Sequence, residues 1–103
     1  MPRTPIITND LVATAIRREG SRIYVVRDTL SLQYVGLGIL MVRSYEAVIG
    51  VLHIKHASII EKATICEGWN GFSPTTSRHL RALYDFVKRE DIPANVVESR
   101  SWR

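Results

Sequence analysis

Residues 69–79 have the sequence WNGFSPTTSRH and decide the fold of this chain, because they place a turn and a helix start before its most regular element. Ser73 and Pro74 are typical of such a start, since serine caps free backbone N–H groups and proline suits the first helical position. Pro93 then stops the helix. The pattern predicts an amphipathic helix over about residues 76–90.

The two sides of this helix differ in chemistry. At helical spacing, one arc gathers the apolar residues that form the buried stripe. These are Leu80, Leu83, Tyr84 and Val87. The opposite side carries the basic residues Arg78, Arg81, Lys88 and Arg89, with Asp85 as the one acid among them. His79 and Phe86 share a flank between the two sides. We therefore expect a helix that packs one side against a sheet and presents a basic side outward.

Upstream of the helix, β-branched and aromatic residues predict a sheet. The expected strands span residues 22–27, 32–43, 45–54 and 59–66, and residues 94–98 fit an added edge strand. Gly36 and Gly38 mark a bulge or a close backbone approach within residues 32–43. Residues 45–54 are apolar on both faces, which indicates a central strand covered on both sides. Residues 59–66 also satisfy a helical pattern.

Two structures compete for residues 10–19. Asn9 fits the cap of a short helix that closes at Gly20, and the spacing of the apolar residues favours this alternative. The other is a strand over residues 12–17 that turns at Gly20. We predict an α+β fold, in which a small, mostly antiparallel sheet of 4–5 strands packs against the C-terminal helix, with a short N-terminal helix under the first alternative.

Length and composition are those of one globular domain. The 103 residues are 46% apolar and 23% charged, which argues against disorder. We expect a single domain over residues 9–98, with tails at 1–8 and 99–103.

A lone cysteine, Cys66, excludes an internal disulfide and suits a reducing cytoplasm. The N-terminus has no signal-peptide core and the longest apolar run, residues 34–42, is too short to span a bilayer, so we expect a soluble cytoplasmic protein with no membrane partner.

The net charge of +4 comes mainly from arginine, which supplies eleven of the fourteen basic residues. Residues 1–27 alone carry a net charge of +3. The planar guanidinium group suits phosphate and carboxylate recognition, so this bias is typical of a protein with a nucleic-acid or ribonucleoprotein partner. A GC-rich genome would produce the same arginine bias.

Two segments resemble a family of small phage proteins of unassigned function. Residues 73–79, Ser-Pro-Thr-Thr-Ser-Arg-His, with Phe72 before them and an apolar helix after them, look like the family's signature. Residues 44–50 are similar to a serine–tyrosine strand that often precedes it, and the match covers roughly residues 44–87. The chain departs from the pattern at Ala47, Gly50 and Pro74. The resemblance implies a phage gene product that acts inside the bacterial cytoplasm, and it brings no catalytic residues.

The start of the C-terminal helix is the first candidate for a site. Its free N–H groups and positive dipole end, beside Arg78, suit a phosphate-sized anion. The residues expected at this anion site are Thr75, Thr76, Ser77 and His79. The structural alternative is that Ser73, Thr75 or Thr76 caps the helix, which stabilises it by about 1 kcal/mol. The two alternatives are compatible, since a cap can be shared with a ligand.

Catalytic and metal chemistry find little support in the sequence. His53 and His56 are three residues apart, which in a strand places their rings on opposite faces, and no paired-cysteine spacing indicates zinc. Cys66 follows an apolar strand residue, which favours a buried inert thiol over a nucleophile paired with His79. Carboxylates are scattered, and no glycine-rich phosphate loop occurs. We expect a non-catalytic protein without metal or cofactor.

The protein is therefore expected to act by contact. The first hypothesis is an inhibitor that docks on a host protein or ribonucleoprotein, such as a bacterial defence complex of the CRISPR type. Its expected contact residues are Arg22, Tyr24, Trp69, Arg78, Arg81, Lys88 and Arg89, together with Trp102. One alternative is direct binding of DNA or RNA through the basic helix side and Arg17, Arg18, Arg22 and Arg27. Another is a phage structural or assembly role, or self-association through a strand edge. Monomer and homodimer are both open.

Overall fold

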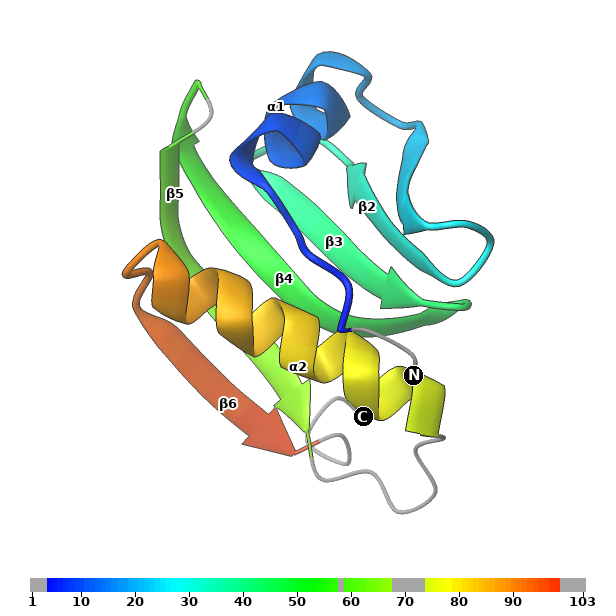
Figure 1. The fold of residues 1–103 in the computed structure, drawn as a ribbon. Helices are drawn as coiled ribbons and strands as arrows, with labels where there is room; N and C mark the ends of the chain where they lie inside the picture. The colour runs from blue at the N-terminus through cyan, green and yellow to red at the C-terminus, as the bar shows by residue number, and fades with distance from the viewer. Residues whose placement is uncertain (1–3, 58, 68–73, 99–103) are drawn as a thin grey trace.

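The computed structural model describes residues 4–57, 59–67 and 74–98. Within them the chain forms α1 (Asn9–Arg17), β1 (Arg22–Val26), β2 (Leu30–Tyr34), β3 (Ile39–Ser44), β4 (Ala47–His56), β5 (Ile59–Glu67), α2 (Pro74–Arg89) and β6 (Ala94–Glu98). Figure 1 shows a single curved sheet with both helices in front of it. The predicted α+β class, the mostly antiparallel sheet and the C-terminal helix packed against it are confirmed.

The sheet contains six strands in the spatial order of the sequence. The first five form an antiparallel meander, whose members are joined by short turns. After β5 the chain crosses through α2 and returns as β6, which pairs with β5 in parallel. A parallel neighbour needs a crossover of this kind, because a hairpin turn can join only antiparallel strands. The edge strand expected at residues 94–98 is therefore present.

The expectation of one strand over residues 32–43 is wrong. The chain reverses between β2 and β3, where Gly36, Leu37 and Gly38 have φ angles of 90°, 54° and 78°. Two backbone bonds close the turn, from the Val35 N–H to the Ile39 carbonyl at 2.9 Å and from the Ile39 N–H to the Gly36 carbonyl at 3.0 Å. The close approach expected at a glycine does occur, since a Cβ on Gly38 would lie 2.7 Å from the Ile54 carbonyl oxygen.

The helix alternative for residues 10–19 is confirmed. The cap of α1 is Thr8 rather than Asn9, and the Thr8 hydroxyl accepts a hydrogen bond from the Leu11 N–H at 3.2 Å. This bond satisfies one of the backbone donors that every helix start leaves free. The strand alternative for residues 59–66 is confirmed as well, because β5 pairs with both of its neighbours.

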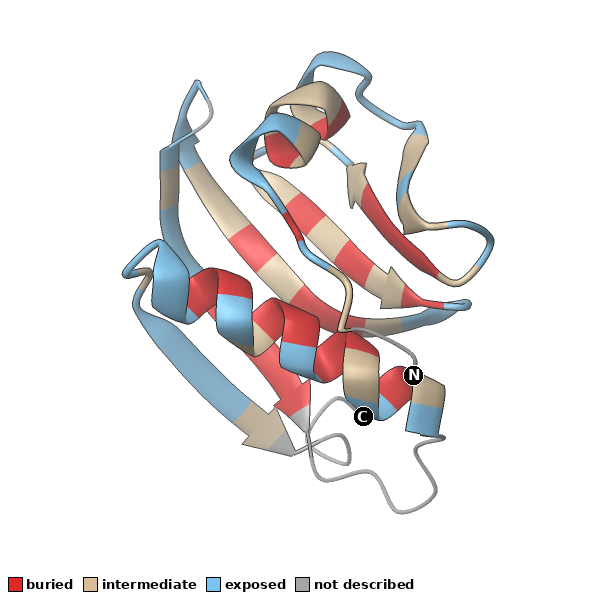
Figure 2. Ribbon diagram, in the orientation of Figure 1, coloured by how far each residue is buried: buried red, intermediate tan, exposed pale blue. Residues whose placement is uncertain are grey.

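The hydrophobic core lies between the sheet and the two helices, which cover the same face (Figures 1 and 2). Buried side chains from α1, the inner face of the sheet and α2 form one cluster with Ile7, which is fully buried although it lies in the expected N-terminal tail. Neither helix covers the opposite face. The strand expected to be central is β4, fourth in the order. In the described part of the chain, helices cover only one of its faces, where cover on both was expected. The strand starts at Ala47, because Tyr45 belongs to a turn.

The end of α2 explains how the chain turns into β6. The Ile92 N–H donates to the Val87 carbonyl at 2.9 Å, and the Asp91 N–H donates to the Lys88 carbonyl at 3.2 Å. These bonds form a Schellman motif, which needs a left-handed residue after the helix. Asp91 takes that position with φ of 55°. At the other end Pro74 is the first residue of α2, as its fixed φ favours, while Ser73 lies outside the described residues.

Candidate partner-binding site

A buried polar cluster joins the first turns of α2 to the last residue of β3. The Ser44 hydroxyl lies 2.7 Å from His79 Nδ1 and 2.9 Å from the Thr76 hydroxyl. Ser44 is 1% exposed, His79 2% and Thr76 8%. Three polar side chains at such burial are tolerated because they hydrogen-bond to one another. The cluster therefore fixes the position of α2 along the sheet.

The electrostatics of this cluster disfavour a charge on His79. Burial lowers the pKa of the imidazole below its usual value, and the nearby Arg78 guanidinium lowers it further. A neutral ring is therefore the form that the cluster accommodates. The Tyr45 ring lies against the cluster, with its centroid 6.2 Å from that of His79.

A serine bonded to a histidine also occurs in acyl-transfer enzymes, and the surroundings of Ser44 argue against that chemistry here. A triad orients its histidine with a carboxylate and exposes the serine to substrate. The third member of this cluster is Thr76, and Ser44 is almost fully buried. The cluster is structural on this geometry.

Of the residues expected at an anion site, some point into the protein and others lie at the surface. Thr76 and His79 point into the protein and bond to Ser44. The Thr75 hydroxyl accepts a bond from Arg78 Nη2 at 3.4 Å, and Ser77 is exposed. An anion at this helix start would therefore meet Ser77 and the backbone, without the imidazole.

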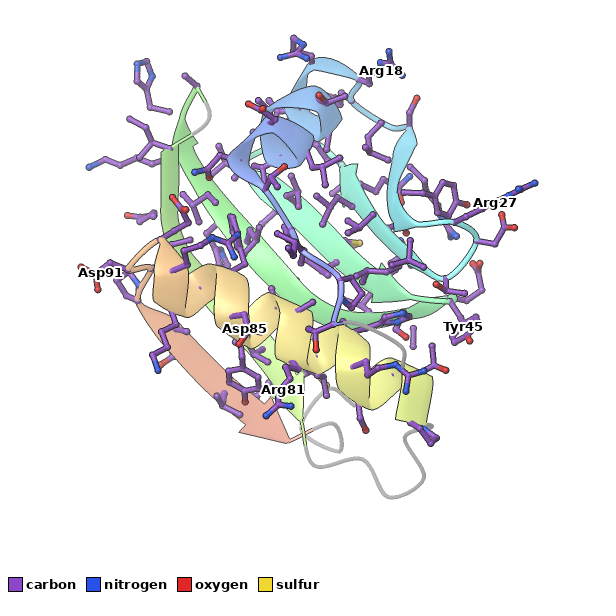
Figure 3. The ribbon with its side chains drawn as sticks, viewed as in Figure 1. Arg18, Arg27, Tyr45, Arg81, Asp85 and Asp91 are labelled. Carbon is purple, nitrogen blue, oxygen red and sulfur yellow. The ribbon has the colours of Figure 1, made fainter. Side chains whose placement is uncertain are left out.

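The basic residues of α2 also differ in direction, since some point outward and one lies against the protein. Arg81 and Asp85 point away from the sheet (Figure 3), and Lys88 is exposed like them. Arg89 instead folds back: its guanidinium donates to the Ile7 carbonyl and lies 5.5 Å from the centre of the Phe86 ring. Arg89 therefore holds the N-terminal segment against the helix, while the outward side of α2 keeps only part of its expected charge.

The face of the sheet that neither helix covers gathers polar and aromatic side chains. Strand pairing aligns one residue from each strand in a row across this face: Arg22, Gln33, Met41, Val51, Thr64 and Asn95. A neighbouring row contains Tyr24 and Arg43, with the buried Ser31 between them, and Lys62 lies beside His53 in a third. We call these residues, with the adjacent Glu46, the open sheet face.

Hydrogen bonds hold several of these side chains in place. Both terminal nitrogens of Arg22 donate to the Glu46 carboxylate, at 2.7 and 2.8 Å. This bidentate bond lowers the pKa of the Glu46 carboxyl and raises that of the Arg22 guanidinium. Arg43 donates through Nε to Gln33 at 3.3 Å, and His53 Nε2 lies 3.2 Å from the Thr64 hydroxyl. The face is therefore ordered before any partner arrives, which reduces the entropy cost of binding.

Two of the expected contact residues, Arg22 and Tyr24, lie on the open sheet face, and Tyr24 is 46% exposed. The α2 residues Arg81 and Lys88 lie on the helix side, so one flat partner surface cannot contact both groups. Arg17 and Arg18 end α1, and Arg27 lies 3.7 Å from the neighbouring Asp28 carboxylate. Trp69 and Trp102 lie outside the described residues.

Sequence reasoning missed Gln33, Arg43 and Glu46. Gln33 and Arg43 are polar residues among apolar ones in β2 and β3, and the prediction of one strand over residues 32–43 concealed that these strands are neighbours. Glu46 lies in the turn that follows β3. Correct placement of the turn at Gly36 would have brought the strand of Gln33 beside that of Arg43.

In the described part of the chain, His, Cys, Asp and Glu side chains form no group of three that could hold a metal ion, and Cys66 is buried. Among the same residues, neither helix is long and apolar enough to cross a membrane. No family model, curated protein or solved structure matches the chain. The geometry of the open sheet face is therefore the basis for a functional proposal.

Proposed function

We propose that this chain is a non-catalytic binding protein that docks on a protein or ribonucleoprotein through the open sheet face. The observation that supports this function most directly is the row from Arg22 to Asn95, several of whose side chains are held by hydrogen bonds, beside the exposed ring of Tyr24. Aromatic and arginine side chains on a pre-ordered surface are the residue types that dominate binding energy at protein interfaces.

The buried polar cluster supports the non-catalytic part of the proposal. Ser44 and His79 are the pair in the described chain whose contact most resembles a nucleophile with its base, and that contact is sealed inside the protein. The open sheet face instead provides hydrogen-bond donors and acceptors in fixed positions, which a partner can contact.

The resemblance over residues 44–87 supports a more specific form of the proposal, in which the partner is a complex of the bacterial cytoplasm, such as a CRISPR-type defence assembly that the protein inhibits. That form rests on the resemblance, whereas the docking face rests on the geometry. The two parts are therefore tested separately.

Affinity capture from a bacterial lysate tests the docking face. We expect one stoichiometric partner that survives nuclease treatment and moderate salt. The double variant Tyr24→Ala, Lys62→Glu should lose it, because both side chains are exposed on the open sheet face. The matched control is Arg81→Ala, Lys88→Ala on the helix side, which should retain it. Loss in the control with retention in the first variant would move the interface to α2 and contradict the proposal.

Direct nucleic-acid binding is the second candidate, and the combination of Tyr24 with Arg43 and Lys62 on one face favours it, because stacking rings and cations bind single strands. Several expected phosphate ligands are already engaged, however: Arg22 by Glu46, and Arg89 by the Ile7 carbonyl. Anisotropy with a labelled single-stranded oligonucleotide tests this candidate. Binding that weakens steeply as salt rises, and capture that disappears with nuclease, would replace the protein partner by nucleic acid.

A further inference from the structure

A surface hollow of about 430 Å³ lies where three distant parts of the chain meet. It is lined by Asn9 at the start of α1, Ile59 and Ile60 at the start of β5, and Glu90 and Ile92 just after α2. We call it the three-isoleucine hollow. It lies on the helix side of the molecule, away from the open sheet face, so none of the residues proposed above line it.

Three of the five residues that line the hollow are isoleucines. Ile60 and Ile92 are half-buried and pack against the core, while Ile59 is 58% exposed. An isoleucine that exposed adds nothing to the core, and burying it under an apolar group would be favourable. These three side chains can therefore make apolar contacts with an aliphatic chain.

Glu90 adds a negative charge to the lining of the hollow. The Glu90 carboxylate accepts a hydrogen bond from Asn9 Nδ2 at 2.6 Å, which holds it beside another lining residue of the hollow. Glu90 also follows directly on the last residue of α2, where the helix dipole presents its negative end and favours a cation. Asp91 adds a second negative charge close by, although it points outward (Figure 3).

The cation nearest to this carboxylate does not neutralise it fully. Arg89 Nε lies 3.7 Å from Glu90 Oε2, which is longer than a hydrogen bond. The Arg89 guanidinium is directed instead toward the Ile7 carbonyl and the Phe86 ring. The carboxylate therefore keeps capacity to accept further hydrogen bonds, since each of its oxygens can take two.

We propose that the three-isoleucine hollow binds an arginine side chain of a partner, with the guanidinium on Glu90 and the aliphatic stem on the isoleucines. Charge complementarity with Glu90 selects the cation, and the isoleucines select a side chain with a long apolar stem. Arginine fits both demands, because its weakly hydrated, planar group pairs with carboxylates while its stem packs on apolar surface. The identity of the partner rests on the function proposed above, whereas the chemistry of the hollow does not.

The test uses n-butylguanidinium as the probe, with the neutral and equally sized n-butylurea as its comparison, and methyl NMR on isoleucine-labelled protein. We expect saturable shifts concentrated at Ile59, Ile60 and Ile92, with a Kd on the order of 1–10 mM, as suits a probe of so few atoms. Ile23 and Ile39, which belong to β1 and β3, serve as internal references.

Glu90→Gln keeps an acceptor for Asn9 and removes the charge, so it should raise the Kd about fivefold. Asp85→Asn removes an exposed acid from the outer side of α2 and should leave the Kd unchanged. Equal binding of n-butylurea would show an apolar rather than a cationic site and would overturn the proposal, as would shifts spread over all isoleucines or none in this range. These results do not depend on lysate capture, so the hollow and the open sheet face can fail independently.

Discussion

The Ser44 hydroxyl lies 2.7 Å from Nδ1 of His79, and this contact joins the end of β3 to the second turn of α2 inside the protein. Thirty-five residues separate the two in sequence. The contact accounts for the helix position along the sheet, and it places a titratable ring where charge is costly.

This placement predicts a pH-dependent stability. The pKa of His79 is lowered in the folded state by burial and by Arg78, whereas the unfolded value is about 6.5. Between the two values the unfolded chain binds more protons, so the free energy of unfolding should rise with pH and level off above about pH 6.5, with a slope of at most ~1.4 kcal/mol per pH unit. Denaturant unfolding between pH 5 and 8 measures this.

The matched variants for that measurement are His79→Asn and His56→Asn. The first keeps a polar group near the Nδ1 position and cannot titrate, so it should flatten the slope; the second removes an exposed imidazole and should preserve it. A slope that persists in His79→Asn would assign the titration to other groups.

Gly50 lies under α2, and the space above it is occupied. A Cβ at this position would come within 2.4 Å of Leu83 Cδ2 and 3.2 Å of the Thr64 carbonyl oxygen. Because Leu83 is fully buried, its displacement would disturb the surrounding core, so Gly50→Ala should destabilise the fold by about 1–3 kcal/mol. Combining it with Leu83→Val should cost less than the sum of the two single changes. Additive losses would show that the helix does not rest on this glycine.

Leu37 has an unfavourable backbone conformation, and its side chain makes no buried contact that would offset it. Its φ is 54° and its side chain is 101% exposed. Asparagine tolerates the left-handed region better, so Leu37→Asn should stabilise the protein by about 0.5–1 kcal/mol. Val35→Asn, a change in the same turn at a residue without positive φ, should bring no such gain. Thermal unfolding of both variants measures the difference; an equal gain in Val35→Asn would attribute it to lost apolar exposure.

Arg89 should contribute to the stability of the fold, whereas the neighbouring Lys88 should not. Arg89→Ala removes the bond to the Ile7 carbonyl and the contact with Phe86, and we expect a loss of about 1 kcal/mol at this half-exposed position. Lys88→Ala removes an exposed cation and should change stability by less than about 0.5 kcal/mol. Chemical denaturation compares them, and similar losses would exclude an anchoring role for Arg89.

Features that depend on local periodicity were predictable. The apolar stripe with Leu80 and Leu83 predicted α2 within two residues at its start and one at its end, and the spacing after Asn9 favoured the helix that forms α1. The β-branched runs likewise located β1 and β5. In each case neighbours in the sequence report on the same buried side of one element.

Features that depend on pairing were not predictable. Val35 to Ile39 is apolar enough to continue a strand, and only the ladder between β2 and β3 shows that the chain reverses there. The candidate sites follow the same rule. Arg22 and Tyr24 were identified as contact residues, but their neighbours Gln33 and Arg43 were not, since strand register decides which side chains share a face.

The sequence by itself therefore determined the α+β class, the helix α2 and its division into an apolar and a charged side, and it favoured the helix α1, because those depend on residues a few positions apart. Only the tertiary structure decided that His79 turns inward to Ser44, that one face of the sheet stays open, and that Glu90 meets three isoleucines at one hollow. Each of these joins residues from distant segments, and such contacts form only when the whole core is buried at once.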